Sequence, residues 1–350
     1  MTNLRLEPMN EVHQEAAAGL LAARHARLLR LVPGQGLLPR RFSVASACSS
    51  LLGSLFSDRH TDAVVALDRD GQLVGYLAGQ RQLYAPEAFA SVYAEPRSVG
   101  IALHGHAVAA DADATEVYTA MYAALAARWS ADGLWTHTVS IPTGVPEVAE
   151  AWVELGFGRK STCAVRSAQA TPPAANPDLS VRRLGTGDDA VMARFHRQLS
   201  GFQTESPMFW PYLSETDAAV AKVRQDLMGG GDAACFVAGA EGTEQGMLLF
   251  TRPVFLSPLL TPESGIYLWE AFVDEHARGA GVGETLLAHA LEWMAGQGLG
   301  WCALHYVAAN PLGGPFWRRQ GFRPLEQTLR RVLDDRVAWA RPGGRGRRSG

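Results

Sequence analysis

The stretch V-D-E-H-A-R-G-A-G-V-G, residues 273–283, decides how this sequence is interpreted. It joins the strand-like run Ile266–Val273 to a helical pattern of apolar residues that begins at Val282. Three of the six residues Arg278–Gly283 are glycines, which tolerate positive φ and leave backbone N–H groups open to an anion at a helix start. Glycine-rich loops are more often plain turns, so the elements around this loop must decide between the two interpretations.

Those elements follow the order strand, helices, strands, helix, strand, helix, strand. Before the loop we expect a strand over Leu179–Leu184, a helix ending near Leu199, a helix over Ser214–Met228, and strands over Ala233–Ala240, Gly246–Thr251 and Ile266–Val273. After it we expect a helix ending before Gly296–Gly300, a strand over Trp301–Val307, a short helix over Pro315–Gln320, and a last strand or strand pair over Phe322–Leu333.

The N-terminal half repeats this plan. It contains a strand at Leu4–Leu6, helices within Glu11–Leu31 and Val44–Phe56, a hairpin over Ala63–Ala78 and a strand over Ile101–Ala109. The motif A-W-V-E-L-G-F, which ends at Phe157, mirrors F-W-R-R-Q-G-F, which ends at Phe322, and gives an offset of 165 residues. The same offset places Gly133 on Gly298, so the sequence predicts an internal duplication.

The duplication predicts two tandem domains of α/β (α+β) class. We expect a first domain over residues 1–167, a linker over 168–177, a second domain over 178–340, and a disordered basic tail over 341–350. The linker sequence A-Q-A-T-P-P-A-A-N-P has the proline and small-residue content of an extended connection. Each domain should contain a mixed, mostly antiparallel central sheet flanked by helices.

Only the second copy keeps the glycine loop. The offset maps Arg278–Gly283 onto Asp113–Tyr118, where every glycine is replaced by a residue with a side chain. Asp111, Asp113 and Glu116 add negative charge at the same place, which repels an anion. We therefore interpret the first copy as degenerate.

Composition excludes several classes of protein. The chain has 350 residues, of which 47% are hydrophobic and 19% charged, so it can build two cores. Its formal charge of -3 makes nucleic acid or an acidic membrane surface an unlikely partner. Four scattered cysteines lack the spacing of a metal or redox motif, and we expect no metal. Without a signal-peptide pattern or a membrane span, we expect a cytoplasmic monomer or homodimer.

Taken together, the motifs resemble those of GNAT acetyltransferases. The similarity rests on a strand ending V-D-E-H-A, the R-G-A-G-V-G loop, a strand followed by Asn310, and F-W-R-R-Q-G-F. It covers Leu179–Leu333 well and Leu4–Arg166 in outline. The resemblance implies a sheet splayed between its fourth and fifth strands, with acetyl-CoA as cosubstrate and its pantetheine between them. A degenerate copy before an intact one also resembles mycothiol synthases, which acetylate a cysteinyl amine.

The resemblance implies a set of cofactor-binding residues. The matching positions are Phe272, Val273, Arg278, Gly279, Ala280, Gly281, Val282, Gly283, Asn310 and Trp317. The residues of the loop correspond to those that hold the pyrophosphate, and Phe272 and Val273 to the strand that bonds the pantetheine. Asn310 is equally explained as a turn residue before Pro311.

The implied reaction is direct attack of a neutral amine on the thioester, which needs a base and can use an acid. Glu270 is the candidate base, because a period of two places it on the same strand face as Phe272. A solvated or salt-bridged glutamate is the alternative. Trp317 stands where the family commonly has a tyrosine, so Tyr306, His305 or water is left as the proton source.

We expect the acceptor site in the loop Gly201–Tyr212. Its candidate contacts are Glu205, Phe209, Trp210 and Tyr212. A hydrophobic lid or a contact with the first domain explains the same residues. The predicted function is transfer of acetyl from acetyl-CoA to a primary amine of a small molecule by the second domain. The alternative is a non-catalytic acyl-CoA sensor or partner-binding protein.

Overall fold

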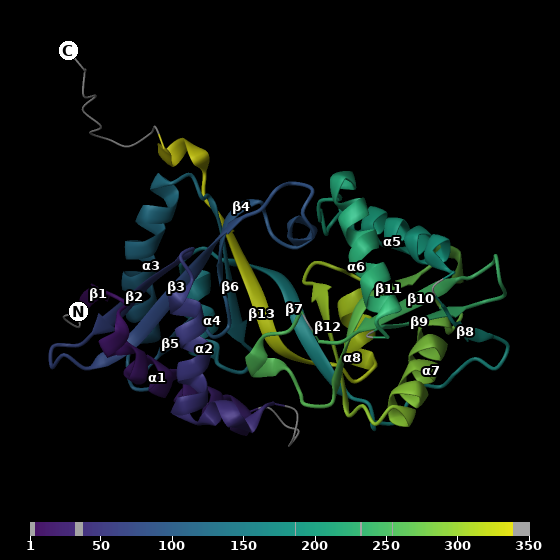
Figure 1. The fold of residues 1–350 in the computed structure, drawn as a ribbon, viewed down its shortest axis with the longest axis horizontal. Coiled ribbons are helices and arrows are strands. Elements are labelled where there is room, and N and C mark those ends of the chain that lie inside the picture. The colour runs from purple at the N-terminus through teal and green to yellow at the C-terminus, as the bar shows by residue number, and fades with distance from the viewer. Residues whose placement is uncertain (1–3, 32–37, 186, 232, 254, 339–350) are drawn as a thin grey trace, which may run out of the picture.

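The computed structural model describes residues 4–31, 38–185, 187–231, 233–253 and 255–338 (Figure 1). The expected tail, 341–350, lies outside these residues. The N-terminal half contains β1 (Arg5–Pro8), α1 (Glu11–Leu31), α2 (Ala45–Ser57), β2 (Thr61–Leu67), β3 (Leu73–Leu83), β4 (Arg97–Ile101), β5 (His106–Val108), α3 (Ala114–Ala131), β6 (Thr136–Pro142), α4 (Pro146–Glu154) and β7 (Gly158–Ser167).

The C-terminal half repeats the order with small changes. It contains β8 (Val181–Arg183), α5 (Asp189–Thr204), α6 (Asp217–Gly229), β9 (Ala233–Ala238), β10 (Gly246–Thr251), β11 (Gly265–Val273), α7 (Val282–Gly296), β12 (Trp301–Val307), α8 (Gly313–Arg319) and β13 (Arg323–Val332). Short 3-10 turns occur in both halves, among them η2 (Phe89–Val92) and η4 (Pro258–Leu260).

Local sequence explains where several of these elements begin and end. The β2–β3 turn is D-R-D-G, in which Gly71 has a φ of 77° and the Asp68 carboxylate accepts the N–H groups of Asp70 and Gln72. Helix α3 begins after Asp113, whose side chain accepts the N–H of Glu116. The predicted single strand Ile101–Ala109 is wrong in one respect, because residues 102–105 interrupt it and separate β4 from β5.

Within the described residues, thirteen strands form one sheet in which antiparallel pairs predominate. Twelve of them lie in the order β1-β2-β3-β4-β6-β13-β7-β12-β11-β10-β9-β8, and β5 pairs with β3. The two parallel pairs are β4 with β6 and β11 with β12, one in each half. The predicted fold class is confirmed: a mixed, mostly antiparallel sheet flanked by helices.

The two halves exchange their last strands. Strand β13, from the C-terminal half, pairs with β6 of the N-terminal half, where Leu329 lies opposite Val139. Strand β7, from the N-terminal half, pairs with β12, where Thr162 lies opposite Tyr306. Strands β7 and β13 also pair with each other at the centre of the sheet (Figure 1). Each half therefore completes the sheet of the other, and a division at residues 168–177 stays a prediction.

Helices cover both faces of this sheet. Buried residues of α1 and α2 pack on one face, where α5 covers the C-terminal half. Buried residues of α3 and α4 pack on the other face, together with those of α7 and α8 in the C-terminal half. The strong twist of the long sheet separates α5 and α6 from α1 and α2 in the view of Figure 1.

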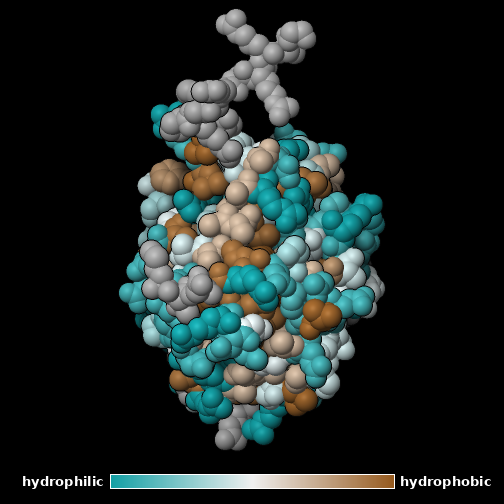
Figure 2. Space-filling model, turned by 90° about the vertical axis from the view of Figure 1, so that its left-hand side faces the viewer, coloured by the Kyte–Doolittle hydropathy of each residue, from teal (hydrophilic) through white to brown (hydrophobic). Residues whose placement is uncertain are grey.

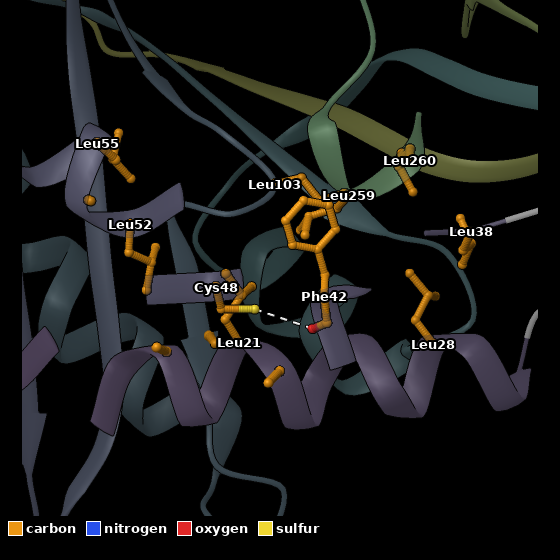
Figure 3. Packing of buried hydrophobic residues seen from close by; sticks show 14 of the residues in the cluster. Leu21, Leu28, Leu38, Phe42, Cys48, Leu52, Leu55, Leu103, Leu259 and Leu260 are labelled. Carbon is orange, nitrogen blue, oxygen red and sulfur yellow. Dashed lines mark hydrogen bonds between the residues drawn. The ribbon is translucent and has the colours of Figure 1, made fainter. Parts of the chain in front are cut away.

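One hydrophobic cluster crosses from one half to the other. Figure 3 shows Leu28, Leu38 and Phe42 of the N-terminal half beside Leu259 and Leu260 of η4. Burial of this kind stabilises by about 25 cal/mol for each Å² of apolar surface, so the cluster adds to the strand exchange in holding the halves together.

On the outer side of the N-terminal half, hydrophobic and hydrophilic residues are interspersed (Figure 2). No described helix is long and apolar enough to cross a membrane.

Candidate cofactor and acceptor sites

The R-G-A-G-V-G loop bends at its glycines before α7 begins. Gly279 has a φ of 82° and Gly281 a φ of 81°, both in the left-handed region where a side chain costs roughly 1–2 kcal/mol. Gly281 is the residue before the first turn of α7, and its carbonyl accepts the Thr285 side-chain hydroxyl at 2.8 Å. The loop backbone is therefore a conformation that this glycine pattern favours.

Four backbone N–H groups at this bend are unpaired. Among the described residues, no acceptor meets the amides of Gly279, Gly281, Val282 and Gly283, whereas Ala280 donates to Ala277 at 3.4 Å. Unpaired amides at the first turn of a helix carry the positive end of the helix dipole. This arrangement binds anions such as a diphosphate.

Arg278 adds a fixed positive charge to the same bend. Its Nε donates to the carbonyl oxygen of Val273 at 3.3 Å. The guanidinium lies 4.9 Å from the ring centre of Phe202 and 5.8 Å from that of Phe272. Contacts of this kind with aromatic rings hold the cation at the mouth of the loop.

A cavity opens beside these amides, near the place where two neighbouring strands stop pairing. Strands β11 and β12 pair with each other from Gly265 opposite Trp301 to Leu268 opposite Leu304. Beyond these residues they no longer pair with each other. The cavity has a volume of about 440 Å³. Nine of the ten residues predicted to bind the cofactor line it: Phe272, Val273, Arg278, Gly279, Gly281, Val282, Gly283, Asn310 and Trp317. The tenth, Ala280, lies in the same loop, and its carbonyl accepts the Asn176 side chain at 3.2 Å.

Two lining residues have structural roles of their own. The Asn310 Oδ1 accepts the N–H groups of Leu312 at 2.9 Å and Gly313 at 2.8 Å, so it stabilises the turn that leads into α8. Trp317 is buried and packs edge-on against Phe316 and Phe322. Both residues shape one end of the cavity.

In the N-terminal half, side chains fill the corresponding cleft. Strands β4 and β6 also stop pairing, after Ile101 and Val139, but Tyr118 stands in place of Gly283 and is fully buried. Its hydroxyl lies 2.7 Å from Nδ1 of His106, and its ring centre lies 5.2 Å from that of Trp152. The cleft that is open in the second copy is closed in the first by these rings.

The outer end of the same cleft is acidic. A surface cavity there is lined by Asp113, Glu147 and Glu150, with Arg27 as its one cation, and Arg27 is paired with Glu147. Carboxylates at this place repel phosphates and other anions. The residues that differ between the two copies therefore change both the free volume of the cleft and its charge.

Glu270, the predicted base, belongs to a buried charged cluster. Its side chain is 4% exposed, and its Oε1 lies 2.9 Å from Nδ1 of His196 on α5 and 3.4 Å from Nη2 of Arg224 on α6. Its Oε2 is buried and has no hydrogen-bond partner among the described residues. Glu270 does not line the cavity, although Phe272, two residues along β11, does.

Sequence reasoning missed His196 and Arg224. They are 74 and 46 residues from Glu270, and nothing local connects them. A signal was nevertheless present: Arg224 occupies the buried side of an amphipathic helix, where an arginine needs a carboxylate partner.

The predicted proton donors lie on β12. His305 Nδ1 lies 2.9 Å from the Tyr267 hydroxyl, and burial lowers the pKa of His305 to about 4. His305 is therefore neutral at pH 7. Tyr306 points to the opposite face, where its ring packs near Gly314 of α8. Neither residue is among those that line the cofactor cavity.

The predicted acceptor residues divide into two groups. Phe209 and Trp210 line a second cavity, and the Trp210 Nε1 donates to the carbonyl oxygen of Val92 in the N-terminal half at 3.1 Å. Glu205 is exposed at the end of α5, and the Tyr212 hydroxyl donates to Asp217 at 2.7 Å. The loop is therefore both an interface with the first half and a wall of a cavity.

Comparisons with known proteins agree with this geometry. Residues 199–322 match the Acetyltransferase (GNAT) family. A GCN5-related N-acetyltransferase from Sphaerobacter thermophilus is 13% identical, with 94% of this chain and 95% of that chain covered and a TM-score of 0.60. A glucosamine N-acetyltransferase region of a fungal multi-domain GH3 β-N-acetylglucosaminidase is 13% identical with a TM-score of 0.53, covering 94% of this chain and 38% of that one.

A tandem GNAT protein from the clavulanic acid biosynthesis pathway is 15% identical, with 94% of this chain and 98% of that chain covered and a TM-score of 0.49. No curated protein matches the sequence. Residues 199–322 thus match the GNAT acetyltransferase family model, and the chain has the fold of GNAT proteins.

Proposed function

We propose that the chain transfers acetyl from acetyl-CoA to a primary amine of a small molecule, in its C-terminal half. The observation that carries this proposal is the group of unpaired amides at the start of α7, which belong to residues that line a cavity beside the end of β11. Amides and Arg278 suit the pyrophosphate, and the cleft between β11 and β12 suits the pantetheine arm.

The chemistry follows from the charge changes in the reaction. The nitrogen lone pair of a neutral amine attacks the thioester carbonyl carbon, the C–S bond breaks, and CoA leaves as a thiolate. The nitrogen then carries an extra proton, which a base must remove. A buried carboxylate with a histidine beside it is suited to that task.

We infer that Glu270 acts in this step through His196. The carboxylate accepts the Nδ1–H of His196, which leaves Nε2 of a neutral ring with a free lone pair. Arg224 compensates the buried carboxylate charge. Because α5 also supplies Phe202 to the first cavity, His196 is on a helix that borders the proposed cofactor site.

The thiolate is neutralised by a proton from a second group. A neutral His305, Tyr306 and water remain the candidates, and the neutral state of His305 makes it a weaker acid than an imidazolium. We propose no transfer in the first copy, because Tyr118 occupies the corresponding cleft. Residues 1–167 then serve as a scaffold that completes the shared sheet.

Incubation of the full chain with acetyl-CoA and a panel of primary amines tests the proposal, with thiol release and mass spectrometry of the acetylated amine as readouts. We expect thiol release that depends on an amine. CoA binding without turnover of any amine would favour an acyl-CoA sensor. Absence of CoA binding would remove the cofactor assignment.

A further inference from the structure

A second cavity lies between the two halves, and the transferase proposal does not by itself explain its charge. It has a volume of about 410 Å³, within the range of small-molecule sites. The N-terminal half contributes residues 91–96 and the start of β7, and the C-terminal half contributes residues 208–211 and 213 and the end of β12. Neither half alone forms this cavity.

Two consecutive residues link this cavity to the proposed cofactor cavity. Ala309 lines it, and the next residue, Asn310, lines the cofactor cavity. Tyr93, another lining residue, accepts the Nε1–H of Trp269 at 2.6 Å. Trp269 is the residue at which β11 bulges out of register with β10, directly before Glu270. Tyr93 therefore connects the cavity lining to Trp269, which precedes Glu270 on β11.

Its charged lining has a surplus of cations. Arg159, Lys160 and Arg330 face a single carboxylate, that of Glu95. Glu95 is shared, because its Oε1 accepts Arg330 at 2.8 Å and its Oε2 lies 3.8 Å from Lys160. Two positive charges of the lining are thus left without a compensating carboxylate in the cavity.

Lys160 is the most enclosed of these cations. Its side chain is 12% exposed, its Nζ donates to the carbonyl oxygen of Tyr93 at 2.7 Å, and it lies 4.9 Å from the ring centre of Trp210. Burial lowers the pKa of the Lys160 ammonium. A buried ammonium with partial compensation gains free energy when an anion binds beside it.

We propose that this cavity binds the acceptor, and that the acceptor is an amine that also carries an acidic group, a carboxylate or a phosphate. The anion would be held by Lys160 and Arg330, and Trp210 and Tyr93 would form apolar walls. The amine would then lie toward Trp269 and the cofactor cleft. This inference rests on the proposed transferase function and adds the chemical class of its acceptor.

Matched pairs of amines test the inference. The pairs are the amino acids with their amides, and O-phosphoethanolamine with ethanolamine, so that each pair differs in its anion. With the full chain and acetyl-CoA, we expect kcat/KM to be higher for the acidic member of at least one pair by about 10- to 100-fold, the value of one or two charge-assisted hydrogen bonds. Which kind of pair responds distinguishes a carboxylate from a phosphate.

Lys160→Met should remove most of this preference without changing CoA affinity. The matched control is Lys222→Met, because Lys222 is the only other lysine of the chain and is 75% exposed on α6. Arg330→Met, at a side chain 42% exposed, is the second variant in case Lys160→Met does not fold. It should reduce the same preference.

Binding provides a readout that does not need turnover. In the presence of CoA, acidic members of the panel should raise the melting temperature more than their neutral partners. Equal effects, or none across the panel, would overturn the acceptor assignment. A preference for the acidic amines that is unchanged in both variants would overturn it too, yet leave the transferase function intact. Absence of CoA binding in the wild type would instead contradict the transferase function itself.

Discussion

Gly283→Tyr transfers the side chain that closes the first cleft to the same place in the second. A Cβ added to Gly283 would lie 3.1 Å and 3.3 Å from the ring of Phe316, and the residue lines the cofactor cavity. In the first copy, Tyr118 fills the matching space against Trp152. We therefore expect the variant to fold, at a cost of about 1–3 kcal/mol from crowding, and to lose CoA binding.

The expected rise in Tm on CoA binding follows from the CoA concentration and the length of the chain. CoA at 100 times its Kd should stabilise the native chain by about 2.7 kcal/mol. Globular proteins unfold with roughly 2.1 cal/mol/K of entropy per residue, so for 350 residues this is a rise in Tm of about 4 °C. Gly283→Tyr should reduce the rise to less than about 1 °C.

Thermal unfolding with and without CoA is the assay, and Gly296→Tyr is the control. Gly296 lies at the far end of α7, and nothing is within 4 Å of a Cβ added there. The control should keep the full rise in Tm. If Gly283→Tyr kept it as well, the cleft between β11 and β12 would not be the cofactor site.

Three further predictions concern acid stability, assembly and catalysis. Burial lowers the pKa of His106 to about 3, so its proton binds only after unfolding, and below pH 6.5 it costs about 1.4 kcal/mol of stability per pH unit. Three other histidines, with pKa values of about 4, act in the same direction. Glu326 opposes them, because burial raises its pKa to about 6. The four histidines together outweigh this one group, so the urea concentration at the unfolding midpoint should decrease as the pH is lowered from 6.5 to 4.5. A constant midpoint would contradict this. Residues 1–167 and 178–350, expressed separately, should be unstable and should form a one-to-one complex when coexpressed, because each lacks a strand that the other supplies; two stable monomers would argue against the exchange. His196→Gln should lower kcat by about 10²- to 10⁴-fold at unchanged CoA affinity, and an unchanged kcat would exclude His196 as the base.

Features that depend on adjacent residues could be predicted from the sequence. The glycines of Arg278–Gly283 require a particular backbone conformation, and their neighbours alternate with the periods of strand and helix. The offset of 165 residues predicts that the first copy is degenerate, because it places Tyr118 at the position of Gly283. These features depend on a few adjacent residues.

Contacts between distant segments were not predictable in this way. The pattern of β13 is that of any half-buried strand, and nothing in it indicates that its partner is β6 of the other half. Glu270 was correctly noted as a strand residue near the cofactor loop, but its contact with His196 depends on how α5 lies on the sheet. Lys160 and Arg330 come together only because the last strands are exchanged.

Isothermal titration of the full chain with CoA tests the central claim most directly. One molecule of CoA should bind each chain, because the amides at the start of α7 are unpaired and face an open cleft, whereas Tyr118 fills the matching cleft of the first copy. Two molecules per chain would show that the first cleft is open. No binding at all would contradict the cofactor site, and with it the proposed function.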